Sequence, residues 1–464
     1  MEMKKYLGII LVGVTLAIGS GCSGSDGGGG GEGGTGGSGL GPNPCQALGG
    51  TGDVEITVDE ITEDTVFEAG CRYFFTRETY VVGAALRIEA GTALYGDKQS
   101  ALIITTTGTI DAQGTSANPI VFTSSALPAE ARPGDWGGVV LLGLARLSWG
   151  DTGCDGELGE CVGSIEGIAV GEARGKFGGD DDSHDCGTLS YVRIEYAGAV
   201  FGDDNELNGL TVGGCGSDTT LEYIQVHRGL DDGVEFFGGT APIDHVLISG
   251  PGDDGLDWDQ GYRGTVDNFI VHHFTSTSSS PNGIEADNFG DGDNNVEPRS
   301  DPDITNGTVI GDGRTEGSGV VTRVGTWGVL DGLVVVGFGA AGYDMRNGAW
   351  SVDGGWPTGI VVENSCFNDN GVNYPVDEND AKDDSASAMT ADFFDEPTLL
   401  ADATRGNLEG DPGLGDYSTA ATGGDPAPNY GLTNDGCLGA FGGPSGMDWT
   451  TGWTAFPTGA ASSN

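Results

Sequence analysis

The sequence predicts an all-β solenoid, specifically a parallel β-helix, from a short phrase that recurs along the chain. Each copy has a glycine, an apolar residue, usually a polar residue and then another side chain, as in Gly233-Val-Glu-Phe and Gly255-Leu-Asp-Trp. The copies begin at Gly209, Gly233, Gly255, Gly283, Gly319 and Gly342, at spacings of 24, 22, 28, 36 and 23 residues. A second, alternating series lies between them: "LSYVRIEY" (189–196), "LEYIQVHR" (221–228), "IDHVLISG" (243–250) and "VDNFIVHH" (266–273). Two strand-like segments per period, without a helical segment, indicate stacked β-coils.

Other repeat architectures fit this pattern less well. Helical repeats need apolar residues three and four positions apart, whereas these segments alternate. Propeller blades run to about 40 residues, which is nearly twice the period seen here. In a parallel β-helix each strand pairs with its counterpart one coil away, so the uneven spacings are insertions at corners. A solenoid tolerates such insertions because each coil contacts only its neighbours.

The N-terminal part of the chain carries the same alternation and a family resemblance. "IEAGTALYGD" (88–97), "GTIDAQGTSANPIVFTSS" (108–125), "RPGDWGGVVLLG" (132–143) and "NGLTVGGCGSDTTLEYIQV" (208–226) resemble a family of bacterial cell-surface and outer-membrane proteins. "LGAFGGPSGMDWTTGWTAF" (438–456) resembles the closing segment of that family. The resemblance implies a right-handed parallel β-helix and a location at the cell surface. Its motifs carry no known chemistry, because members of the family are mostly uncharacterised.

Alternation along each strand assigns the two faces of the repeated phrase. The residues after the glycines point inward, so Val234, Leu256 and Ile284 stack in the core. The opposite face is acidic. One of its columns contains Glu235, Asp257 and Glu285, and the column beside it contains Asp259 and Asp287. Neighbouring rungs lie about 4.8 Å apart, so like charges in a column repel by about 1 kcal/mol per pair in water.

Three interpretations of these acidic columns stay open. The first is a fully hydrated face, with Arg323 and Arg346 available as counter-charges. The second is a divalent-cation site formed by Glu235, Asp257, Asp259, Glu285 and Asp287, for which Ca²⁺ suits an all-oxygen ligand set. The third is catalysis.

A polysaccharide-active enzyme is the catalytic alternative. Asp231, Asp232, Asp253 and Asp254 form two pairs one coil apart, at separations that glycosidases use. The Gly-His-Gly and Arg-x-Lys elements of polygalacturonase-type enzymes are missing, and Arg323 is the one modest candidate for a lyase base. A structural, adhesive or glycan- or cation-binding protein is therefore expected ahead of an enzyme.

Histidines offer weaker sites. His184 in "DDDSHDC" (180–186) could bind a transition metal only if Cys186 were free. His272 and His273 cannot both face one side of a strand, which argues against a paired metal site.

The chain begins with an export signal. Lys4 and Lys5 precede the apolar segment 6–18, and "GSGC" leads into Cys22, which is similar to a bacterial lipoprotein signal. The departure is Gly19, where an apolar residue is usual. We expect residues 1–22 to be the signal with lipidated Cys22, and the Gly/Ser-rich residues 23–44 to be a tether on a bacterial outer membrane or cell surface.

Eight further cysteines suggest disulfides in an oxidising compartment. Pairing by proximity gives Cys45–Cys71, Cys154–Cys161, Cys186–Cys215 and Cys366–Cys437, although eight cysteines allow 105 connectivities. The formal net charge of −51 excludes nucleic acid and argues against anionic membrane surfaces as electrostatic partners. The membrane is therefore expected as a partner through the lipid anchor alone, with a glycan or a surface protein as the other candidate partners.

Residues 45–370 are expected to form the β-helix and residues 371–464 an acidic capping segment. "FFDEPTLLA" (393–401) is a short helix candidate. The acidic residues 377–428, together with Trp449 and Trp453, are expected to cover the open C-terminal end, because a solenoid must protect its last strand edges.

Overall fold

The computed structural model describes residues 40–457 and 459, apart from residues 149–160, 170, 203–204, 275–280, 289–295, 347–358, 376–395, 415–429, 431–432 and 435. The expected signal with Cys22, and nearly all of the expected tether, lie outside the described residues. Within the described part, no helix is long and apolar enough to cross a membrane.

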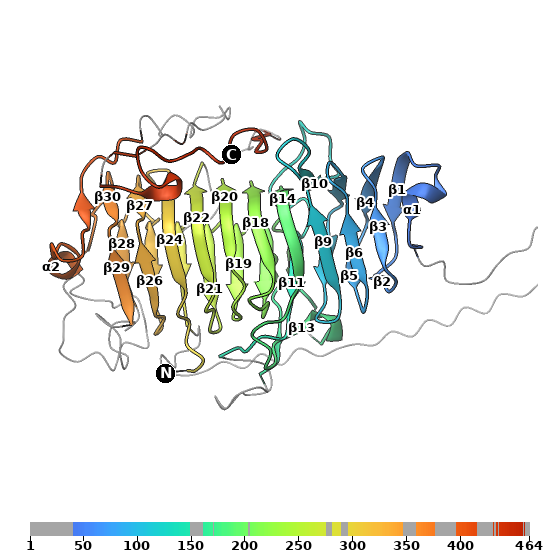
Figure 1. Ribbon diagram of the computed structural model, residues 1–464, viewed down its shortest axis with the longest axis horizontal. Helices are drawn as coiled ribbons and strands as arrows, with labels where there is room; N and C mark the ends of the chain where they lie inside the picture. Colours follow the sequence, from blue (N-terminus) through green and yellow to red (C-terminus); the bar gives the residue numbers. More distant parts are fainter. Residues whose placement is uncertain are drawn as a thin grey trace, which may run out of the picture. The chain divides into compact units, whose positions relative to one another are not determined.

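The chain folds into a right-handed parallel β-helix, as the sequence predicts (Figure 1). One wall is a ten-stranded parallel sheet. Its strands are β2 (Glu60–Ile61), β5 (Glu78–Val81), β8 (Ala101–Ile104), β11 (Val139–Leu142), β17 (Leu210–Gly213), β19 (Val234–Phe237), β21 (Leu256–Asp259), β23 (Ile284–Ala286), β25 (Val320–Thr322) and β28 (Tyr343–Met345).

The remaining walls belong to a 17-stranded sheet. Its strands are β1 (Gly52–Ile56), β3 (Thr65–Phe67), β4 (Cys71–Phe75), β6 (Ala85–Ile88), β7 (Ala93–Gly96), β9 (Thr109–Gln113), β10 (Ile120–Ser124), β14 (Gly187–Glu195), β18 (Thr220–His227), β20 (Ile243–Ser249), β22 (Thr265–His272), β24 (Asp303–Ile310), β26 (Gly328–Asp331), β27 (Val334–Val336), β29 (Ile360–Glu363), β30 (Cys366–Asn368) and β31 (Leu408–Glu409).

The long strands of the 17-stranded sheet bend in the middle, which gives each coil three straight stretches. β14 pairs through its first half with β9 and through its second half with β10. The residue at the bend adopts left-handed backbone geometry, with φ between 49° and 56° at Tyr191, Tyr223, His245, Asn268 and Asn306. The sequence showed two segments per period and did not reveal this bend.

Strand register confirms the predicted columns. Val234 pairs with Leu256 and Leu256 with Ile284, and all three are buried in the main core. The repeated glycine begins each turn because a side chain has no room there. A Cβ on Gly255 would lie 2.3 Å from Val271 Cγ1 and 2.6 Å from the Gly283 carbonyl oxygen. The glycine therefore lets the ten-stranded sheet approach the β-branched residues of the opposite wall.

Of the three interpretations of the acidic columns, the fully hydrated face is wrong. Thr211 and Val321 are fully buried on that face, and Glu235 is 8% exposed. A second apolar cluster covers part of the face, where Ile165 and Phe177 pack with Val140 and Leu142 of β11. These covering residues come from a Gly/Asp-rich insertion that includes the short antiparallel strands β12 (Gly163–Ser164) and β13 (Lys176–Phe177). The insertion contains few apolar residues, so its sequence did not predict that it would cover the sheet.

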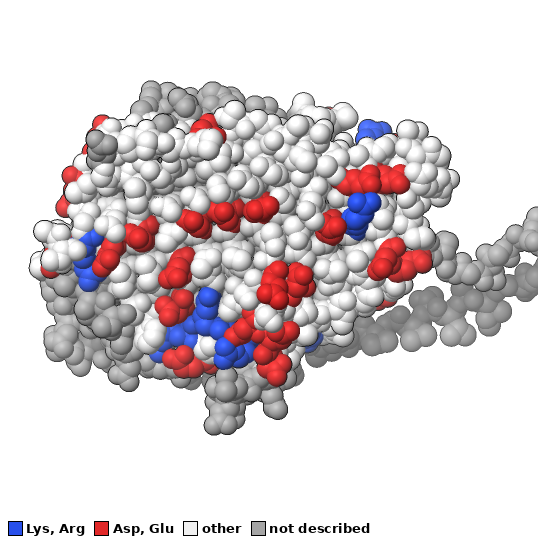
Figure 2. Space-filling model, viewed as in Figure 1, with Lys and Arg blue, Asp and Glu red and all other residues white. Residues whose placement is uncertain are grey.

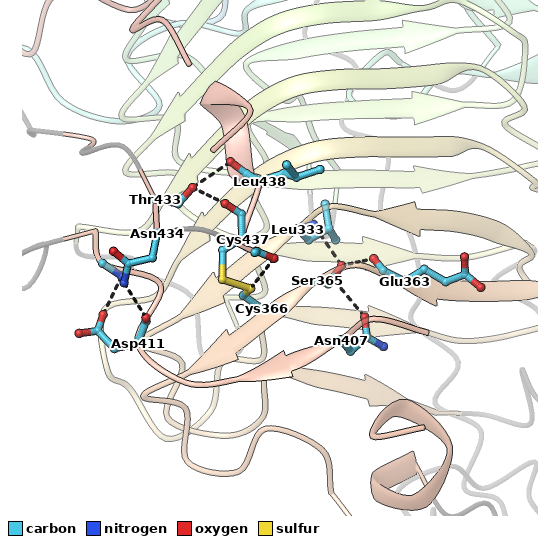
Figure 3. The surroundings of a disulfide bond; sticks show 12 residues. Leu333, Glu363, Ser365, Cys366, Asn407, Asp411, Thr433, Asn434, Cys437 and Leu438 are labelled. Carbon is cyan, nitrogen blue, oxygen red and sulfur yellow. Dashed lines mark hydrogen bonds between the residues drawn. A yellow bond between two sulfur atoms is a disulfide. The ribbon is translucent and has the colours of Figure 1, made fainter. Parts of the chain in front are cut away.

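Three of the four expected disulfides are confirmed. Cys45 in α1 (Pro44–Ala47) binds Cys71, Cys186 binds Cys215, and Cys366 in β30 binds Cys437 (Figure 3). Cys161 is disulfide-bonded, and its expected partner Cys154 lies outside the described residues. The Cys366–Cys437 bond ties the C-terminal segment to the last coils.

The C-terminal end is covered by the predicted helix rather than by the tryptophans. α2 (Glu396–Leu400) places Leu400 in the main core, and its Glu396 carboxylate accepts a hydrogen bond from the Met345 backbone N–H at 2.8 Å. Trp449 and Trp453 instead pack against His245 and Tyr223 on the side of the coils. The expectation that they cover the end is wrong, because the segment turns back along the solenoid (Figure 1).

Gly255→Ala should lower the free energy of unfolding by about 1–3 kcal/mol, since the added methyl group overpacks the contact with Val271. Chemical denaturation of the two proteins measures the difference. Gly410→Ala is the matched control, because nothing lies within 4 Å of a Cβ at that position. An equal effect of both substitutions would contradict the packing explanation.

Candidate functional site

The most distinctive polar feature of the structure is a group of carboxylates on the ten-stranded sheet and at its entry corners. We call it the acidic cluster. Its members are Asp231, Asp232, Glu235, Asp253, Asp254, Asp257, Asp259, Glu285 and Asp287. Parallel register produces it, since Glu235 pairs with Asp257 and Asp257 with Glu285 on successive rungs.

The entry corners add a second row of acids. The Asp232 carbonyl accepts the Gly209 N–H, and the Asp254 carbonyl accepts the Gly233 N–H. The Asp232 carboxylate also accepts the Asp254 N–H at 2.8 Å, which fixes one corner to the next. The sequence marked these aspartates only as a catalytic alternative, because periodicity does not show which corner side chains turn toward the strand column.

Three groups of oxygens in the cluster come close enough together to share a cation. They are Asp231–Asp232–Asp253, Asp232–Glu235–Asp257 and Asp254–Asp257–Glu285, and within each group the atoms lie within 4.8 Å of one another. Ca²⁺ binds oxygens at about 2.3–2.6 Å, so two ligands on opposite sides of one ion are about 5 Å apart. Asp257 belongs to two groups and Asp232 to two, so the groups form a continuous row.

The five metal ligands predicted from the sequence divide into two sets. Glu235 and Glu285 each belong to one of these groups, and Asp257 belongs to two. Asp287 accepts two hydrogen bonds from the Arg323 guanidinium, at 2.7 and 2.8 Å, and the same guanidinium contacts Glu285. Asp259 accepts the backbone N–H of Gln260. Among the described residues, Asp259 and Asp287 belong to none of the three groups.

Two asparagines and one arginine partly compensate the charge. Asn208 donates to Glu235, and the Asn282 side chain donates to Glu285 at 2.9 Å. The Asn282 backbone N–H donates to Asp254. Burial opposes the charge of Arg323, but Asp287 and Glu285 outweigh burial and raise its pKa. One guanidinium offsets only part of the charge of nine carboxylates.

Burial and mutual repulsion raise the pKa values of these acids. Burial, followed by the charge of Asp253, raises the pKa of Asp231 to about 7. Burial, followed by Asp287, raises the pKa of Asp259 to about 7. At Asp257, burial and then Glu285 raise the pKa well above its usual value. Both causes disfavour charge, so the cluster must take up protons or cations near neutral pH.

Asp257 has a further property that favours a cation over a proton. One of its carboxylate oxygens, Oδ1, is buried and accepts no hydrogen bond from the described residues. A buried acceptor without a donor costs about 1–3 kcal/mol, more if it is charged. A bound cation would satisfy this oxygen and reduce the repulsion between its neighbours in one step.

The other candidates from the sequence do not form sites. Cys186 is in a disulfide, so the described residues around His184 lack the thiolate that a transition metal would need. His272 and His273 point to different partners, the Tyr430 hydroxyl and the Asn282 carbonyl. Arg346 is paired with Asp344, and Arg323 is held by two carboxylates, which leaves it poorly suited as a lyase base.

One comparison, with models of protein families, agrees with the fold. The model of the family described as "Pectate-lyase like beta helix domain" matches residues 59–408. The full-length tailspike protein 2 of Escherichia coli O157:H7 bacteriophage CAB120 is similar at 15% identity and a TM-score of 0.23. That match covers 65% of this chain and 34% of the tailspike, about a third of its length. The comparison with curated protein sequences gives no match.

Without divalent cations, the folded protein should lose stability as pH rises from about 4 to 7. Asp231 and Asp259 have pKa values raised to about 7 from 3.8, so the folded state binds more protons than the unfolded state in that window. Thermal unfolding in EDTA at intervals of pH measures the slope. Stability that stays level or rises across this window would contradict the raised pKa values, because acids that ionise freely contribute no slope.

Proposed function

The chain belongs to the pectate-lyase-like β-helix domain family, and from this premise and the acidic cluster we propose a cation-binding cell-surface protein. In this proposal, divalent cations, Ca²⁺ in particular, bind along the row of carboxylates on the ten-stranded sheet. The role of the bound protein is structural or adhesive, with a glycan or a surface protein as its partner.

The observation that carries the proposal is the shared position of Asp257. It stands between Asp232 and Glu235 on one side and Asp254 and Glu285 on the other, and it contributes to a group on each side. Its Oδ1 atom lacks a donor among the described residues. Only oxygens are offered, which is the ligand set that hard cations such as Ca²⁺ prefer.

The same acids could instead serve catalysis on a polysaccharide, which is the second candidate. One observation favours it: the pKa of Asp231 is raised to about 7, the range in which a carboxyl can act as a general acid. Incubation with polygalacturonate separates the candidates, because a hydrolase creates reducing ends and a lyase creates unsaturated products that absorb ultraviolet light. A cation-binding protein leaves the polymer length unchanged.

Attachment to the outer membrane is the second half of the proposal. It is supported by the sequence "GSGC" before Cys22 and by the Gly/Ser-rich residues that follow, which separate a lipid from the folded domain. The disulfides fit an exported protein, because such bonds persist in oxidising compartments.

Ca²⁺ should raise the melting temperature of the wild-type protein in a concentration-dependent manner. A cation that binds only the folded state stabilises it by about 2.7 kcal/mol at a hundred-fold excess over Kd. Asp257→Asn combined with Glu285→Gln should abolish this rise, because it removes the shared ligand and its neighbour. Without cation, the same variant should be as stable as wild type or more stable, since repulsion is reduced.

A matched control is Glu55→Gln combined with Asp303→Asn, which removes two exposed acids far from the cluster. This variant should keep the full response to Ca²⁺. A wild-type melting curve that is indifferent to Ca²⁺ and Mg²⁺ would exclude the cation proposal, whatever the variants do.

Mass spectrometry of the mature protein from its native membrane should detect a diacyl- or triacylglyceryl group on Cys22 as the first residue. Cys22→Ser should release the protein from the membrane fraction. An uncleaved segment 19–22, or a cleaved Cys22 without acyl chains, would contradict the anchor and leave the cation proposal untouched.

A further inference from the structure

A groove lies on another wall of the β-helix, where the C-terminal segment crosses the bend of the 17-stranded sheet. The segment is fixed at one end by η5 (Gly439–Phe441), whose Ala440 N–H donates to the Thr308 hydroxyl at 3.0 Å. Further along, Ala455 exchanges hydrogen bonds with Gln225 in both directions, at 2.7 and 2.9 Å. Between these attachments the groove has a volume of about 440 Å³.

The floor of the groove is a column of rings. Tyr191 stacks on Tyr223 with centroids 4.4 Å apart, and Tyr223 stacks on His245 at the same distance. Trp453 meets the Tyr191 ring edge-on at 5.7 Å, and Trp449 meets His245 edge-on at 5.1 Å. The result is a packed group of five rings, in which Trp453 is buried and the other four are partly exposed to the groove.

The backbone at these rings is unusual. Left-handed geometry suits asparagine, which occupies the same bend in the next coils as Asn268 and Asn306. Tyr191 and Tyr223 hold φ values of 49° and 52°, which is uncommon for bulky side chains. Strained positions persist where surrounding structure fixes them, and they cluster at binding sites. The asparagine column could have continued here, so the aromatic rings point to a role beyond turning the chain.

The polar lining consists of amides, hydroxyls and one carboxylate. Asn268 and Asn306 lie beside the aromatic column, and Thr451 and Asp448 lie on the C-terminal segment. No lysine or arginine lines the groove among the described residues. A row of carboxylates borders it, one per coil, at Glu222, Asp244 and Asp267 in register, and Figure 2 shows acidic residues in a row across this face. The surroundings therefore repel anions.

The carboxylates near the groove already have hydrogen-bond donors. Asp267 accepts from the Thr305 hydroxyl at 2.6 Å and the Asn306 amide at 2.7 Å. Asp244 accepts from the Asn268 amide at 2.9 Å. Asp448 accepts from Thr450 and Thr451 at 2.6–2.8 Å. Carboxylates compensated in this way offer little to a cationic ligand, which would need their charge unshared.

We propose that this groove binds a neutral saccharide. The C–H face of a sugar ring packs on aromatic rings, while its hydroxyls bond to amides and hydroxyls at the edge, which are the two kinds of group present here. Ligand sites generally combine aromatic walls with a few polar groups in this way. Successive coils, about 4.8 Å apart, offer equivalent side chains at a spacing comparable to the length of one pyranose residue.

This inference rests on the glycan partner of the proposed function, for which it names a site and a chemical class, and it is independent of the cation-binding part. The groove lies on the 17-stranded sheet, whereas the acidic cluster lies on the ten-stranded sheet. Asp257→Asn with Glu285→Gln should therefore leave saccharide binding unchanged, and loss of Ca²⁺ binding would not count against the groove.

The test is titration calorimetry of the full chain with hexasaccharides of β-1,4-glucose, α-1,4-glucose, xylose and mannose. Oligogalacturonate and spermine represent an anionic and a cationic ligand. At least one neutral hexasaccharide should bind with Kd below the millimolar range. Tyr223→Leu, which removes the central ring, should weaken that binding tenfold or more while the melting temperature shows that the fold is retained.

Phe74→Leu is the matched control, because Phe74 stacks on Tyr95 at 4.8 Å in another register column, outside the groove. It should leave binding unchanged. If Tyr223→Leu unfolds the protein, Asn306→Ala, which removes an amide of the lining, serves instead with the same expected loss. Binding of spermine or oligogalacturonate alone, no binding of any neutral hexasaccharide, or equal effects of the groove and control substitutions would overturn the proposal.

Discussion

Parallel pairing of each coil with the next is the constraint on which the rest of this structure depends. Because strands align without a shift, a residue type repeated at one position of the coil becomes a column of identical neighbours about 4.8 Å apart. For apolar residues this produces the continuous core from Val54 to Val362. For carboxylates the same geometry concentrates charge, and for rings it produces stacks. A residue type repeated in the sequence therefore becomes a column of similar side chains on one wall of the β-helix.

The acidic cluster shows that stacking like charges in this way is energetically unfavourable. Water could hydrate Glu235, Asp257 and Glu285 if their wall were open, and the repulsion between them would then be small. The wall is partly covered, so burial and repulsion together raise the pKa values of these acids. A covered column of like charges is unfavourable unless something neutralises it. Arg323 does so at one end, and in the proposed function protons and cations compete for the remaining acids.

Local pattern was enough to predict the fold, the strand register and three disulfides, because each depends on periodicity or on nearby cysteines. Local pattern did not predict features that depend on which distant segments of the chain pack over a wall of the β-helix. The insertion containing Ile165 and Phe177 covers part of the outer face of the ten-stranded sheet, through contacts with residues that are not its neighbours in sequence. Trp453 of the C-terminal segment contacts Tyr223, which lies some two hundred residues earlier in the sequence. The corner acids Asp232 and Asp254 join the cluster through backbone turns that alternation does not describe.

The two sites also differ in how they relate to stability. At the acidic cluster, removing carboxylates relieves repulsion, so a variant without the proposed cation ligands need not lose its fold. In the groove, the rings that would contact a ligand also hold the C-terminal segment against the coils through edge-on contacts. Ligand binding there would add to contacts that already exist, so it should tighten the attachment of that segment without creating it. The acidic column therefore lowers the stability of the folded chain, whereas the aromatic column contributes packing contacts as well as the lining of a groove.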